Sequence, residues 1–105
     1  MLFRLFKHKD IEDFAKSLAD RYAKRFPPEL QDESREGAQH KRDAAMASIH
    51  SLVSEFHKRT PLGIYKRAEL ANSLKWELKE RGYQKALVDS IVYDMLIQLA
   101  SSKKN

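Results

Sequence analysis

The sequence contains no cysteine. This absence excludes disulfides, thiolate zinc sites and cysteine nucleophiles, and it fits the reducing environment of the cytoplasm. Long apolar runs are also missing, since no stretch approaches the ~20 residues that a membrane-spanning helix needs. We therefore expect a cytoplasmic protein without a transmembrane segment.

Glycine and proline are scarce, with three of each in the chain. Because the glycines are isolated, there is neither a glycine-rich phosphate loop nor a Gly-x-Ser-x-Gly nucleophile elbow. Metal-binding helix spacings such as His-Glu-x-x-His are absent as well. The nearest approach to a metal site is Asp32, Glu36 and His40 at intervals of four. We interpret this set as the solvated, acidic first turn of a helix.

Titratable side chains elsewhere show no catalytic pattern. His50 and His57 would lie about 10 Å apart along a helix, too far to share a metal ion easily, and they flank an apolar stripe as boundary residues. Glu77 and Glu80 stand among basic residues and are interpreted as salt-bridged surface. We expect no enzymatic activity, no cofactor and no requirement for a metal.

The composition is typical of one folded domain. Hydrophobic residues make up 42% and charged residues 33% of the chain, which is too apolar for a disordered protein. The net charge of +5 permits nucleic acid or an anionic membrane as a partner and requires neither. We predict a single domain over 1–105, with a basic and apolar leader over 1–9 and a frayed basic tail over 101–105.

The leader has large apolar residues interrupted by Arg4 and Lys7, and no signal-peptide cleavage site follows it. If it continued the next helix, its apolar residues would lie on the side opposite the apolar stripe of that helix. We therefore expect the chain to break at Asp10 and the leader to fold back onto the core. Contact with a membrane surface is the alternative.

Apolar residues recur with the helical period in four segments. The first covers 10–26, with Asp10 as its N-cap, and the second follows an acidic linker and covers 34–59. Thr60 and Pro61 fit the N-cap and first position of a third helix over 61–81, and a fourth helix covers 84–100. The sequence thus predicts an all-α, compact four-helix domain with short antiparallel connections.

A tight turn at Gly82-Tyr83 joins the third and fourth helices. Gly82 fits the C′ position of a Schellman motif, which places Tyr83 at C″ against Leu78 at C3. The fourth helix has no good N-cap residue, and the sequence does not indicate what satisfies its first N–H groups.

The same turn resembles that of a helix-turn-helix motif, with glycine and apolar residues at the expected places. It also resembles the helical repeats of RecX-type recombination regulators, over less than a third of the chain. Leu78 is large and Arg81 is charged where the helix-turn-helix pattern has small and apolar residues, and Asp89 lies where a phosphate or base would be bound. We therefore rank DNA recognition by this turn below the two functions that follow.

The fourth helix is apolar nearly all the way round. Its main face is followed, about 150° away, by a second face that carries Ala86, Tyr93, Ile97 and Ala100. A helix that is apolar all round is buried all round, so this helix is either central in the domain or completed by another chain. Burying Tyr93 and Ile97 is worth roughly 3–5 kcal/mol. We predict a non-enzymatic protein–protein interaction module that forms a homodimer through this second face; an unidentified protein partner is also compatible with it.

Clusters of basic residues favour a second class, a nucleic-acid-binding accessory protein. The candidate contacts are aromatic and basic residues of the third helix, namely Tyr65, Lys66, Lys75, Trp76 and Lys79. This helix carries two apolar stripes, one with Ile64 and one with Trp76. Aromatic residues on such a stripe more often pack in the core than bind a ligand, and we favour a core position for Trp76. Because acidic residues interleave with the lysines, we expect binding to be weak and non-specific.

Overall fold

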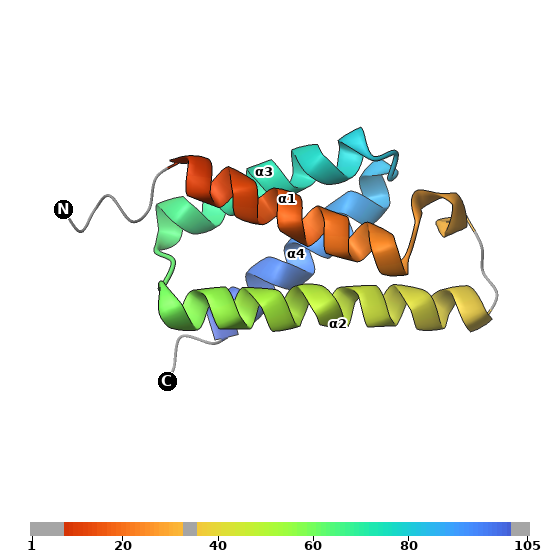
Figure 1. The fold of residues 1–105 in the computed structure, drawn as a ribbon, viewed down its shortest axis with the longest axis horizontal. Coiled ribbons are helices and arrows are strands. Elements are labelled where there is room, and N and C mark those ends of the chain that lie inside the picture. The colour runs from red at the N-terminus through yellow and green to blue at the C-terminus, as the bar shows by residue number, and fades with distance from the viewer. Residues whose placement is uncertain (1–7, 33–35, 102–105) are drawn as a thin grey trace.

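The computed structural model describes residues 8–32 and 36–101, and this part of the chain contains four α-helices (Figure 1). They are α1 (His8–Arg25), α2 (Glu36–Arg59), α3 (Ile64–Glu80) and α4 (Lys85–Ser101), with a short 3-10 turn, η2 (Pro28–Leu30), after α1. No strand occurs in the described ranges. The predicted all-α, four-helix fold is confirmed. The predictions for residues 1–7 and 102–105 lie outside the described residues.

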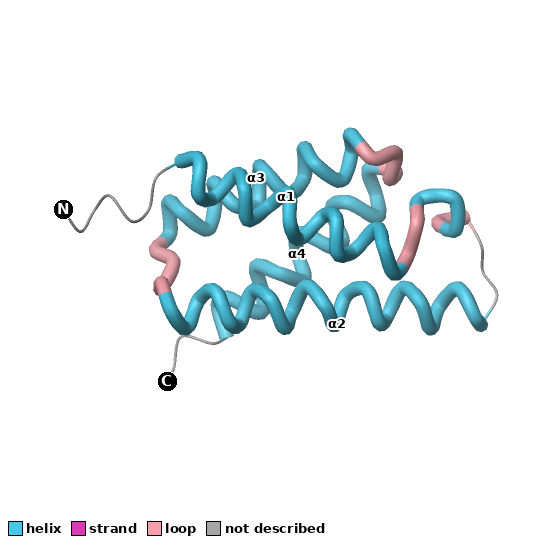
Figure 2. Tube along the Cα trace, viewed as in Figure 1, coloured by secondary structure: helices cyan, strands magenta, loops and turns pink. Residues whose placement is uncertain are grey.

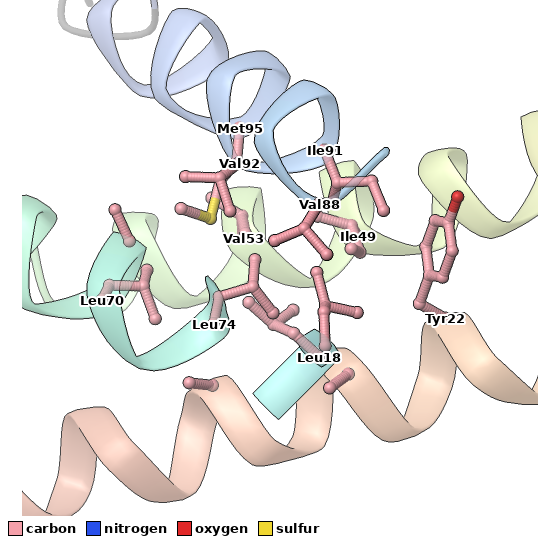
Figure 3. Close-up of a cluster of buried hydrophobic side chains, with 14 of the residues drawn as sticks. Leu18, Tyr22, Ile49, Val53, Leu70, Leu74, Val88, Ile91, Val92 and Met95 are labelled. Carbon is pink, nitrogen blue, oxygen red and sulfur yellow. The ribbon is translucent and has the colours of Figure 1, made fainter. Parts of the chain in front are cut away.

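The helices surround a single core. α1 packs against α2 and α3, and α4 packs against the same two helices. A close-up shows α1 and α4 on opposite sides of the buried side chains (Figure 3). Consecutive helices run in opposite directions, and four-residue connections, 60–63 and 81–84, join the last three helices (Figure 2). This is the predicted antiparallel arrangement.

The core is built from the apolar stripes that the sequence predicts. On α1, Ile11, Leu18 and Tyr22 recur at helical spacing and are almost completely buried. Phe14 of α1 stacks on Phe56 of α2, with ring centroids 4.1 Å apart, and this contact joins the two helices. No polar or charged residue is buried in the part of the chain described here. Burial of apolar surface is therefore the main term that stabilises the fold.

α1 begins before Asp10, so two predictions about this position are wrong. The helix already includes His8 and Lys9, which places Asp10 in its first turn and not at the N-cap. The chain does not break at Asp10 either. In the first turn the carboxylate of Asp10 interacts favourably with the helix dipole without acting as a cap. Lys9 also forms an i,i+4 ion pair with Asp13 at 3.7 Å.

α3 starts at Ile64, later than predicted. Thr60 does not act as its N-cap, because the N–H and the hydroxyl of Thr60 both donate to the carbonyl of Phe56 in α2, at 2.8 and 3.3 Å. Leu62 is buried in the connection, and its N–H donates to Nδ1 of His57 at 3.1 Å. The end of α2 therefore uses the residues that the sequence assigns to the start of α3.

Gly82 forms the predicted Schellman turn between α3 and α4. Its φ of +101° lies in the region that favours glycine. The N–H of Tyr83 donates to the carbonyl of Leu78 at 3.2 Å, and the N–H of Gly82 donates to that of Lys79 at 3.0 Å. These two hydrogen bonds define the motif, and the predicted turn is confirmed.

Two side chains of this turn hold it against α1. The hydroxyl of Tyr83 donates a hydrogen bond to the carbonyl of Phe26, just beyond the end of α1. The guanidinium of Arg81 pairs with Asp20 of α1 and, at 2.6 Å, with Glu77 of α3. The interpretation of Glu77 as salt-bridged surface is confirmed.

Gln31, in the loop after η2, caps the start of α4, which has no good N-cap residue of its own. Its Oε1 accepts the N–H of Gln84 at 2.7 Å, and its Nε2 donates to the carbonyl of Gly82 at 2.8 Å. The neighbouring Asp32 accepts a hydrogen bond from Nε2 of Gln84 at 3.0 Å. A residue about fifty positions away therefore satisfies an N–H group at the start of α4.

Candidate functional site

The second apolar face of α4 is exposed. We call it the α4 strip: Ala86, Tyr93, Ile97 and Ala100. Tyr93 is 67% exposed and Ile97 47% exposed, and these two side chains adjoin because they lie one helical turn apart. The opposite side of α4 is buried through Val88, Ile91, Val92, Met95 and Leu99. The option that α4 is central and enclosed on all sides is therefore wrong. That the strip forms an interface stays a prediction.

Charged side chains lie beside the α4 strip on both flanks. On the side of α2, the carboxylate of Asp94 lies 3.9 Å from Nε2 of His50. On the side of α3, Asp89 pairs with lysines. The middle of the strip, at Tyr93 and Ile97, has no charge of its own. An apolar centre with a charged rim is the usual composition of a protein–protein interface.

Asp89 is surrounded by lysines from two helices. Lys75 of α3 lies 3.8 Å from one carboxylate oxygen, and Lys85 of α4 lies 2.8 Å from the other. The pKa of Asp89 is held below its ordinary value, chiefly by the hydrogen bond from Lys85 and further by the charges of Lys85, Lys75 and Lys79. The same hydrogen bond raises the pKa of Lys85. We call Lys75, Lys79 and Lys85 the lysine cluster.

A cavity of about 280 Å³ opens between α3 and α4 beside this cluster. Its lining combines charged with apolar and aromatic side chains: Lys75, Lys85, Asp89, Val92, Tyr93 and Leu96. Sequence reasoning missed Lys85 and the proximity of Tyr93 to the lysines of α3. The i,i+4 spacing of Lys85 and Asp89 is a local signal, but only the packing of α3 on α4 adds Lys75.

Of the predicted nucleic-acid contacts of α3, Lys66 is separated from the rest. Lys66 and Lys75 are nine residues apart, which puts them on opposite sides of a helix, and Lys66 pairs with Glu69 at 3.4 Å. Lys75 pairs with Asp89 of α4, and the charge of Lys79 acts on the same carboxylate, so both belong to the lysine cluster. Lys66 therefore lies apart from the other four residues, Tyr65, Lys75, Trp76 and Lys79, which helical spacing places within about 100° of one another on α3.

Trp76 is 63% exposed, so the interpretation of Trp76 as a core residue is wrong. Ile64 and Tyr65 are also exposed. The core side of α3 is formed by Leu70, Ala71, Leu74 and Leu78, and Trp76 lies away from it. Trp76 lines a cavity of about 410 Å³ together with Glu12, Asn72, Ser73 and Glu77. Two carboxylates beside the ring do not favour a phosphate there.

Histidines and carboxylates show no metal centre among the described residues, where no group of three could hold an ion. His57 accepts the N–H of Leu62, and His50 lies beside Asp94. Both imidazoles are half-buried, so the prediction of boundary histidines is confirmed.

Comparison with known proteins gives no relative of this chain. No protein-family model matches it, and neither a curated protein nor a solved structure shows significant similarity. Within the described residues, no helix has the length and apolarity needed to cross a membrane. The features of the described residues that bear on function are the α4 strip and the lysine cluster.

Proposed function

We propose that this chain is a non-enzymatic interaction module that forms a homodimer through the α4 strip. The observation that carries the proposal is the exposure of Tyr93 and Ile97, one turn apart, on a helix whose opposite side is fully packed. Large exposed apolar side chains gathered at one place are typical of interaction sites. A cytoplasmic location belongs to the proposal, because a cysteine-free chain fits a reducing compartment.

The expected dimer is weak. Completing the burial of Tyr93 and Ile97 contributes about 2–3 kcal/mol per copy, because each is already partly covered. A two-fold interface contains every residue twice, which gives about 4–6 kcal/mol from these side chains. Association costs about 4–15 kcal/mol in lost translational and rotational freedom. Further contacts around the strip are needed, and we expect a dimer that dissociates on dilution.

Matched glutamate variants test the proposal. Ile97→Glu places a charge inside the strip and should give a folded monomer. Ile64→Glu is the control, because Ile64 is 79% exposed on α3 and lies outside the strip. Sedimentation velocity at several concentrations, with circular dichroism to verify folding, should show association for the wild type and the control but not for Ile97→Glu. Wild-type protein that stays monomeric, or equal association of all three chains, would overturn the proposal.

Nucleic-acid binding is the second candidate function. The observation that favours it is the lysine cluster, where Lys75 and Lys85 pair with Asp89 and the charge of Lys79 adds to theirs. Net positive charge remains in the cavity that Tyr93 also lines. Each phosphate contact steepens the log–log salt dependence by just under one. Two or three contacts therefore predict a shallow slope and little affinity at physiological salt. An anisotropy titration over a salt series tests this, and no binding even at low salt would remove the candidate.

A further inference from the structure

The cavity between α3 and α4 combines three chemistries within one small volume. Its lining has the charged side chains of Lys75, Lys85 and Asp89, the apolar side chains of Val92 and Leu96, and the aromatic ring of Tyr93. At about 280 Å³ the cavity lies near the lower limit for small-molecule sites. Its size suits one flat ring with one anionic group.

Asp89 shows where an anionic group is held in this cavity. Its two carboxylate oxygens are held by lysines of different helices, at 3.8 Å from Lys75 and 2.8 Å from Lys85. The ammonium groups thus already converge on an anion. Two ammonium groups pair with this one carboxylate and the charge of Lys79 also acts on it, so positive charge remains for a second anion.

Tyr93 supplies the surface for the ring. It is the most exposed of the cavity's apolar and aromatic side chains, and it lines the same cavity as Lys75 and Lys85. Aromatic side chains beside a positively charged groove are the usual means of binding unpaired bases without sequence preference. Trp76, which has the larger ring, lies instead beside Glu12 and Glu77.

We infer that this cavity binds a nucleotide unit, with its phosphate at Lys75 and Lys85, supported by the charge of Lys79, and its base against Tyr93. The inference rests on the second candidate function and names its site. The unit can come from a single-stranded nucleic acid or from a free nucleotide, which share the same chemistry. Because Tyr93 also belongs to the α4 strip, self-association and nucleotide binding would compete.

Two probes distinguish the sources: a fluorescein-labelled eight-residue oligothymidylate, followed by anisotropy at low salt, and adenosine monophosphate, followed by calorimetry. The measurements are made on dilute wild-type protein and repeated with Ile97→Gln, which should be monomeric and does not line the cavity. Binding of either probe at the cavity supports the inference and identifies the source.

Charge-matched variants locate the binding. Lys85→Gln should weaken it about threefold to tenfold, and Tyr93→Ala should weaken it about tenfold. Asp89→Asn removes the competing carboxylate and should tighten it. Lys58→Gln, an equal loss of charge at the exposed end of α2, is the control and should have little effect.

The opposite signs expected for Lys85→Gln and Asp89→Asn separate binding from a structural role, because both variants break the same ion pair. Equal weakening by Lys85→Gln and Lys58→Gln would overturn the cavity as the site while leaving nucleic-acid binding in place. If neither probe binds, both the inference and the second candidate function are overturned.

Discussion

The Tyr83 hydroxyl offers a sharp test of how the α3–α4 turn is held. Tyr83 is buried, and its hydroxyl donates to the carbonyl of Phe26 across 57 positions of sequence. Tyr83→Phe removes this hydrogen bond but keeps the ring, whose edge-on contact with Tyr22 has a centroid distance of 5.6 Å. The carbonyl then loses a buried donor. We expect the free energy of unfolding to fall by about 1–2 kcal/mol.

Urea denaturation followed by circular dichroism measures this loss. The midpoint should shift without a change in the m-value, because the same surface is exposed on unfolding. Tyr93→Phe is the control, since Tyr93 is exposed on α4, and its effect should stay within about 0.5 kcal/mol. If Tyr83→Phe were as stable as the wild type, or both variants lost equal stability, the reasoning about the anchored turn would be wrong.

Three further predictions concern the same region. Gln31→Ala removes the cap of α4 and should lower the free energy of unfolding by about 1 kcal/mol. The control Gln39→Ala breaks a hydrogen bond within α2 and should leave the free energy of unfolding nearly unchanged. Equal losses in the two variants would contradict the capping role. Gly82→Ala should cost about 1–2 kcal/mol in urea, because φ is +101° while the added Cβ meets nothing closer than 3.8 Å; an unchanged midpoint would refute this. Burial raises the pKa of Tyr22 to about 12 above about 10 in the unfolded chain. Between pH 10 and 12 Tyr22 should therefore lower the free energy of unfolding by up to about 1.4 kcal/mol per pH unit. Burial also raises the pKa of Tyr83, which adds a loss of the same sign, and a flat alkaline profile would contradict the buried hydroxyls.

Much of the fold could be predicted because its signals are local. The stripe from Ile11 to Phe26 has the helical period, and its main members are buried in α1 and just beyond its end. Gly82 marks the end of α3 by a conformation that other residues adopt only at a cost. Both signals depend on spacing within a few residues, which the sequence shows directly.

Contacts between distant segments could not be predicted. The cap of α4 comes from Gln31, which accepts a hydrogen bond from the N–H of Gln84, 53 residues later in the chain. Lys75 meets Asp89 only because α3 and α4 pack side by side. Helical spacing showed that Trp76 lies on a second face of α3, but whether another helix covers that face depends on packing. The candidate sites are therefore less predictable than the helices that carry them.

The most direct test of the central claim is the mass of the unmodified chain at sedimentation equilibrium over a dilution series. Self-association through the α4 strip predicts an average mass that rises with concentration from 12.3 kDa towards twice this value and no further. A mass of 12.3 kDa at every concentration, or growth beyond the dimer, would contradict a closed homodimer built on Tyr93 and Ile97.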